Sequence, residues 1–146
     1  MKVLVINGPN LNLLGEREPE VYGDDSLQSI NDSLLFHAKD LNCEISFFQN
    51  NSEGRIIDEL HDARLKYDGV ILNAGAYTHY SYAIRDAIAA INIPVIEVHL
   101  SNINNRDEFR KTSVIAPVCA GSIAGFGKRS YELALRAMSY LVGEKP

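Results

Sequence analysis

The sequence predicts an α/β protein in which helices cover both faces of a five-stranded parallel sheet. Two patterns lead to this prediction. Short apolar runs alternate along the chain with longer segments in which apolar residues recur at helical spacing. The short runs are apolar throughout, which is typical of strands that are buried on both faces of a parallel sheet.

Each element follows from its local pattern. The predicted strands are residues 2–7, 44–48, 69–73, 94–99 and a short run at 122–124. The first predicted helix spans residues 26–42, and either Asp25 or Ser26 can cap it. A second helix starts at Ser52, and a third ends before Pro94. Residues 107–111 can form a short turn, and Tyr131, Leu135, Met138 and Leu141 stripe the final helix. Five such units predict a flavodoxin-like, doubly wound fold with three α/β/α layers.

Composition narrows the class of protein. A chain of 146 residues that is 46% hydrophobic suits one domain, which we expect to span residues 1–146. It has no apolar stretch near the roughly 20 residues of a membrane span and no signal-peptide pattern, so we expect a cytoplasmic protein without membrane contact. The net charge of −5 argues against nucleic acid as a partner. Cys43 and Cys119 lack metal-ligand spacing and are expected to be reduced.

Polar side chains follow the predicted strands where each strand ends. Because ligands of open parallel sheets bind beyond the carboxyl ends of the strands, we expect a site there. The long, non-periodic segment 8–24 after the first strand is a candidate binding loop. The alternative is that these side chains are polar only because surface loops generally are. The candidates are Asn7, Asn10, Arg17, Tyr22, Asn73, His79, Glu97, His99, Ser101, Arg106 and Arg110.

Glu97 and His99 are two residues apart on a strand, so their side chains share one face. A carboxylate beside an imidazole fixes its tautomer and stabilises its protonated form, as a general acid requires. The alternative is a satisfied polar pair at a strand end. A metal site that includes His79 is less well supported, because no motif spacing favours it.

Arg17 and Tyr22 share the long loop. A nearby guanidinium favours the phenolate and can turn a tyrosine, whose ordinary pKa is about 10, into a usable base. The alternative is that Tyr22 anchors the loop by packing while Arg17 is solvated.

Four segments in order resemble one known family over nearly the whole chain. They are residues 7–15 (NGPNLNLLG), 17–23 (REPEVYG), 73–79 (NAGAYTH) and 97–102 (EVHLSN). Together they resemble type II 3-dehydroquinate dehydratase. The resemblance implies a flavodoxin-like hydro-lyase that converts 3-dehydroquinate to 3-dehydroshikimate without cofactor or metal. It also implies a homododecamer built from four trimers.

The resemblance also implies roles for single residues. Tyr22 would be the base, with Arg17 shifting it toward phenolate, and His99, oriented by Glu97, would be the acid. Asn10 would hold a water against the developing enolate. The substrate carboxylate would be bound by Asn73, Ser101 and the backbone of Leu100, and the ring hydroxyls by His79 and Arg110. Asp86 would enter the site of a neighbouring subunit, and the loop that carries Arg17 and Tyr22 would close as a lid.

Other classes of protein fit the sequence less well. A phosphoacceptor domain would need an acidic pair after the first strand, where Asn7 and Gly8 stand. A flavin carrier would need serines or threonines between Gly8 and Gly15, and there are none. A Schiff-base route would need a lysine at the carboxyl end of a strand on this edge, and none is present. The remaining alternative is a flavodoxin-like ligand-binding or signalling module without catalysis.

Overall fold

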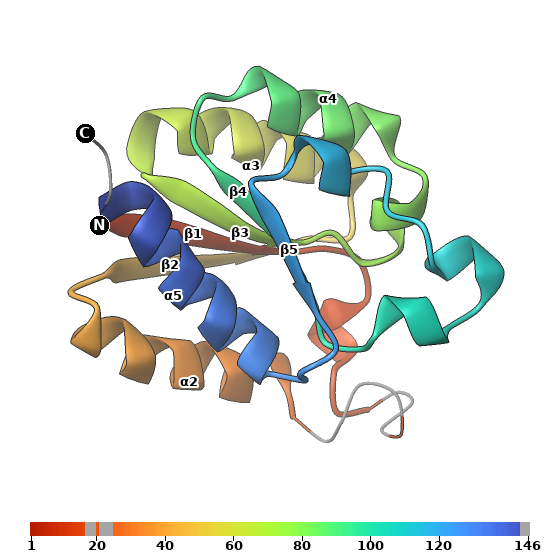
Figure 1. Ribbon diagram of the computed structural model, residues 1–146, viewed down its shortest axis with the longest axis horizontal. Coiled ribbons are helices and arrows are strands. Elements are labelled where there is room, and N and C mark those ends of the chain that lie inside the picture. Colours follow the sequence, from red (N-terminus) through yellow and green to blue (C-terminus); the bar gives the residue numbers. More distant parts are fainter. Residues whose placement is uncertain (17–19, 21–24, 144–146) are drawn as a thin grey trace.

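Five parallel strands form one sheet in the computed structural model, which describes residues 1–16, 20 and 25–143 (Figure 1). The strand order is β2-β1-β3-β4-β5, so the flavodoxin-like prediction is confirmed. The strands are β1 (Lys2–Asn7), β2 (Glu44–Gln49), β3 (Gly69–Asn73), β4 (Val95–His99) and β5 (Gly121–Ala124).

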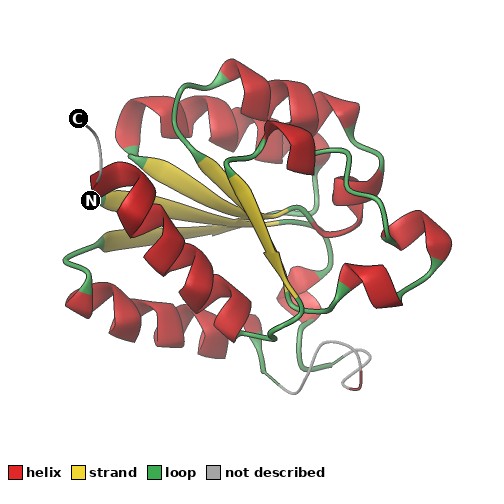
Figure 2. Cartoon of the chain, viewed as in Figure 1, coloured by secondary structure: helices red, strands yellow, loops and turns green. Residues whose placement is uncertain are grey.

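Helices cover both faces of the sheet (Figure 2). On one face lie α2 (Leu27–Asp40) and α5 (Arg129–Gly143), and on the other lie α3 (Glu53–Lys66) and α4 (Tyr82–Ala90). Successive residues of β1 point to opposite faces, so Val3 joins the core beneath α2 and α5 while Leu4 joins the other core. The apolar runs therefore become strands that are buried on both sides.

The helix starts follow the sequence closely. Ser26, and not Asp25, caps α2 by accepting a hydrogen bond from the backbone N–H of Ser29 at 3.1 Å. One detail of the last helix differs from the predicted stripe, because Leu141 is 43% exposed. It lies ten residues beyond Tyr131, which at about 100° per residue turns it roughly 80° away from the buried side.

The order of the strands determines where a site can form. The chain leaves β1 toward β2 on one side and later returns to β3 on the other, so the order reverses between β1 and β3. The segments after β1, β3 and β4 all emerge at this carboxyl edge of the sheet (Figure 1). In the described part of segment 8–24, Leu11 and Leu14 are buried in the core. This part of the predicted binding loop is therefore anchored by packing.

Candidate active site

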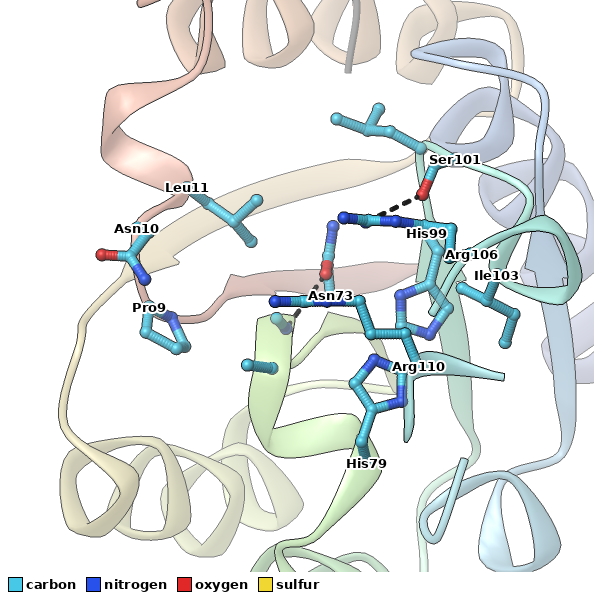
Figure 3. Close-up of a pocket in the computed structure, with 13 residues that line it drawn as sticks. Pro9, Asn10, Leu11, Asn73, His79, His99, Ser101, Ile103, Arg106 and Arg110 are labelled. Atoms are coloured by element: carbon cyan, nitrogen blue, oxygen red, sulfur yellow. Dashed lines mark hydrogen bonds between the residues drawn. The ribbon is translucent and has the colours of Figure 1, made fainter. Parts of the chain in front are cut away.

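A pocket opens at the carboxyl edge of the sheet, where the segments after β1, β3 and β4 meet (Figure 3). Most of the described site residues selected from the sequence line this one pocket: Asn10, Asn73, His79, His99, Leu100, Ser101 and Arg110. Parallel strands bring these distant segments together because their carboxyl ends share one edge.

His99 forms one wall of the pocket, and Glu97 lies directly behind it. Nε2 of His99 is 2.5 Å from Oε2 of Glu97, and Glu97 is 1% exposed. The two side chains share one face of β4, as their spacing predicts. Because an ionised carboxylate only accepts hydrogen bonds, Nε2 carries the hydrogen of this contact. Nδ1 is then the ring nitrogen that can exchange a proton with a bound molecule.

Two serines hold the other oxygen of the Glu97 carboxylate. Oε1 accepts hydrogen bonds from Oγ of Ser113 at 3.0 Å and from Oγ of Ser122, on β5, at 3.1 Å. Burial raises the pKa of Glu97, but the hydrogen bonds from His99 and both serines, together with the charge of His99, outweigh burial. The pKa therefore lies below its ordinary value, and the carboxylate stays ionised.

His79 lies beside His99 with its ring stacked at a centroid distance of 6.5 Å. Its Nδ1 is 2.7 Å from the carbonyl oxygen of Thr112, so Nδ1 must be the protonated nitrogen. Burial lowers the pKa of His79, and the nearby charges of His99 and Arg110 lower it further. His79 is therefore a neutral imidazole that can offer Nε2 as a hydrogen-bond acceptor.

Two arginines supply positive charge at the pocket. The guanidinium of Arg110 lies 4.7 Å from the ring centroid of Phe109, and its Nε is 3.8 Å from Oδ2 of Asp107. Nη1 of Arg106 donates a hydrogen bond to Oγ of Ser101 at 3.4 Å. A pocket with two guanidinium groups in a chain of net charge −5 favours a small anionic ligand.

Apart from Glu97, which lies behind His99, and Asn7 at the end of β1, three predicted site residues are not among those that line this pocket. Asp86 is exposed on α4 and is absent from the lining. Arg17 and Tyr22 lie outside the described residues. Their roles stay predictions.

Sequence reasoning missed the residues that support the site. It noted Arg106 at this edge but gave it no role, and it did not select Ser113, Ser122 or Tyr131. Patterns local in sequence could not identify them, because Ser122 and Tyr131 meet partners 25 and 58 residues away. A signal was available only for Ser113, which lies in the polar segment that follows β4.

Other chemistries find little support in the described part of the chain. Within residues 1–16, 20 and 25–143, no group of three or more His, Cys, Asp or Glu residues could hold a metal ion. Cys43 and Cys119 are free, and burial raises the pKa of the Cys119 thiol to about 12. Over the same ranges, no helix is long and apolar enough to cross a membrane.

Comparisons with known proteins match almost the whole chain. The family model described as Dehydroquinase class II matches residues 1–139. A 3-dehydroquinate dehydratase of Caldicellulosiruptor bescii is 58% identical over 142 residues, which cover 97% of this chain and 98% of the relative. One from Bacillus licheniformis is 57% identical over 133 residues, covering 91% and 92%. The crystal structure of a type II dehydroquinase from Butyrivibrio crossotus has a TM-score of 0.93 at 48% identity and covers 94% of this chain and 97% of its own. The chain therefore belongs to the class II dehydroquinase family.

Proposed function

We propose that this chain is a type II 3-dehydroquinate dehydratase, a hydro-lyase that eliminates water from 3-dehydroquinate to give 3-dehydroshikimate. Relatives at 57–58% identity carry this name. The observation that carries the proposal is the Glu97–His99 pair at the wall of a pocket with two arginines. A buried carboxylate–imidazole pair suits proton transfer, and the arginines suit a substrate that bears a carboxylate.

The first step removes a proton from the carbon beside the ketone of the substrate. Tyr22 takes this proton as phenolate, with Arg17 favouring the ionised form. The electrons of the C–H bond move to the ketone oxygen and give an enolate, which a water held by Asn10 stabilises.

The second step expels the β-hydroxyl group on the opposite face, as an anti elimination. The enolate re-forms the ketone, a carbon–carbon double bond forms, and the C–O bond breaks. The protonated His99 gives its Nδ1 proton to the departing oxygen, which leaves as water, while Glu97 keeps the ring oriented. Return of a proton from Tyr22 to solvent and from solvent to His99 resets the site. The elimination of water involves no net oxidation or reduction, and its proton transfers are assigned to side chains, so we propose that it needs no cofactor or metal.

Binding of the substrate uses the remaining residues of the pocket. We assign the substrate carboxylate to Asn73, Ser101 and the backbone of Leu100. The ring hydroxyls are assigned to His79 and Arg110. The neutral state of His79 fits this assignment, because Nε2 can accept a hydrogen bond from a hydroxyl group.

The assembly proposed for the chain is a homododecamer of four trimers in the cytoplasm. Asp86 is the residue that would link subunits, and its exposed position on α4 leaves it accessible to a neighbouring chain. Sizing by light scattering at micromolar concentration tests this, and an active species of about 16 kDa would contradict it.

An assay of the metal-free protein tests the function. After dialysis against a chelator, the chain should convert 3-dehydroquinate to a product with the ultraviolet absorbance of a conjugated ketone. His99→Ala and Tyr22→Phe should each lower kcat by roughly a hundredfold or more, because each removes one proton-transfer group. His61→Ala, at an exposed histidine on α3, serves as the control and should be fully active. An inactive native chain that still bound a ligand would favour the non-catalytic alternative.

A further inference from the structure

Tyr131 connects α5 to the floor of the pocket without touching the pocket itself. Its hydroxyl group lies between the two asparagines that end neighbouring strands, Asn7 on β1 and Asn73 on β3. These asparagines are paired in register, and the residues two before them, Val5 and Ile71, belong to the core beneath α2 and α5. Both amides therefore face the helix that carries Tyr131.

The hydrogen bonds among Asn73, Tyr131 and Asn7 form a chain in which the donor and acceptor of each contact can be assigned. The backbone N–H of Gly75 can only donate, and it donates to Oδ1 of Asn73 at 3.1 Å. Nδ2 of Asn73 must then donate, and it does so to the Tyr131 hydroxyl oxygen at 2.9 Å. The Tyr131 hydroxyl group in turn donates a hydrogen bond to Oδ1 of Asn7 at 2.5 Å. Each donor is matched to an acceptor, so one orientation of the Asn73 amide is selected.

The selected orientation decides what Asn73 offers to a ligand. Its carbonyl oxygen is occupied by Gly75, and one of its two amide hydrogens is occupied by Tyr131. The remaining polar group is an N–H, and Asn73 is one of the residues that line the pocket. A carboxylate oxygen accepts such a hydrogen bond, whereas an exposed amide oxygen would repel it.

We infer that Tyr131 is a positioning residue for anion recognition: its hydroxyl group holds the Asn73 amide so that an N–H faces the substrate carboxylate. This inference rests on the proposed function and extends it to a residue outside the pocket wall. Tyr131 is 0% exposed, and burial raises its pKa, so its hydroxyl group stays protonated and keeps donating to Asn7. It takes no part in the proton transfers.

Tyr131→Phe tests the inference, because a residue that only positions a binding group should change KM and leave kcat nearly unchanged. Without the hydroxyl group, the amide of Asn73 loses one of its two hydrogen-bond partners. Only the Gly75 N–H then holds it, so the amide is free to turn its oxygen toward the pocket more often. We expect KM for 3-dehydroquinate to rise roughly tenfold, while kcat changes less than about twofold, because the carboxylate is bound equally in the ground and transition states. Tyr140→Phe is the matched control, since Tyr140 lies on the same helix and is 65% exposed.

A double-mutant cycle separates positioning from a general loss of structure. In an Asn73→Ala background, Tyr131→Phe should cause no further rise in KM, because the residue acts through Asn73. If Tyr131→Phe does not fold, Asn7→Ala provides the test instead, because it removes the acceptor that orients the same hydroxyl group. It should likewise raise KM and leave kcat nearly unchanged. Additive effects in the cycle, or an unchanged KM in an active Tyr131→Phe variant, would overturn the inference. An inactive native chain would instead contradict the proposed function.

Discussion

Nε2 of His99 lies 2.5 Å from Oε2 of Glu97, and the second oxygen of that carboxylate accepts hydrogen bonds from Ser113 and Ser122. The imidazole is thus oriented by a carboxylate that, among the described residues, accepts hydrogen bonds from His99, Ser113 and Ser122. This arrangement fixes the orientation of the imidazole and leaves its Nδ1 available to the pocket.

Glu97→Gln should lower kcat by about a hundredfold with little change in KM, since an amide cannot stabilise the imidazolium form of the acid. Steady-state rates at neutral pH measure this effect. Glu44→Gln, at an exposed carboxylate on β2, is the control and should behave as the native protein. If Glu97→Gln kept the native kcat, Glu97 would have no role in the general-acid function of His99.

The two serines should set the acidity of Glu97. Replacing both Ser113 and Ser122 with alanine removes two donors to the carboxylate, so the pKa of Glu97 should rise from its lowered value. Titration followed by carbon NMR of the Glu97 carboxyl group measures the shift directly. We also expect kcat to fall by roughly fivefold to tenfold in this double variant.

Threonine at both positions keeps the hydroxyl groups and provides the matched comparison. It should restore the lowered pKa and most of the rate. An unchanged pKa in the double alanine variant would show that His99 alone keeps Glu97 ionised.

Protonation of His79 should destabilise the fold in mildly acidic solution. Its pKa in the folded chain lies below the ordinary value of 6.5, so between the two values the unfolded chain binds more protons. The free energy of unfolding should therefore fall as pH drops below 6.5, and the loss should be complete below the folded pKa. Urea unfolding from pH 8 to pH 4 measures this.

His79→Gln should have a flatter profile over this pH range, because glutamine does not titrate. His61→Gln, at an exposed histidine on α3, should keep the slope of the native protein. Equal slopes for native protein and His79→Gln would mean that His79 does not couple protonation to stability.

Gly8 should not tolerate a side chain. A Cβ atom there would lie 2.7 Å from the backbone carbon and oxygen of Ala74, so the ends of β1 and β3 would have to move apart at the floor of the site. We expect Gly8→Ala to destabilise the fold by about 1–3 kcal/mol and to lower activity. Thermal unfolding and the assay test both effects.

Gly54→Ala is the matched control. The nearest atom to its added Cβ is 3.8 Å away, and the residue lies in the first turn of α3. It should leave activity unchanged and raise stability by up to about 1 kcal/mol, because alanine favours the helix. Equal stability losses in both glycine variants would argue against close packing at Gly8.

Much of this fold could be predicted from the chain because its signals are local. Periodicity within ten to twenty residues identifies each strand and helix, and alternation along β4 puts Glu97 and His99 on one face. The rule that ligands bind beyond the carboxyl ends of parallel strands then assigned Asn73, His79 and Arg110 to one pocket.

The supporting contacts depend instead on which distant segments meet. Ser122 reaches Glu97 because β5 pairs with β4, and Tyr131 reaches Asn7 across 124 residues because α5 packs on the sheet beneath β1 and β3. No local pattern carries this information, since register and helix packing arise only when the whole sheet assembles. The residues with a chemical role could therefore be predicted from the sequence. The groups that orient them and keep Glu97 ionised could not, because only packing between segments far apart in sequence brings them together.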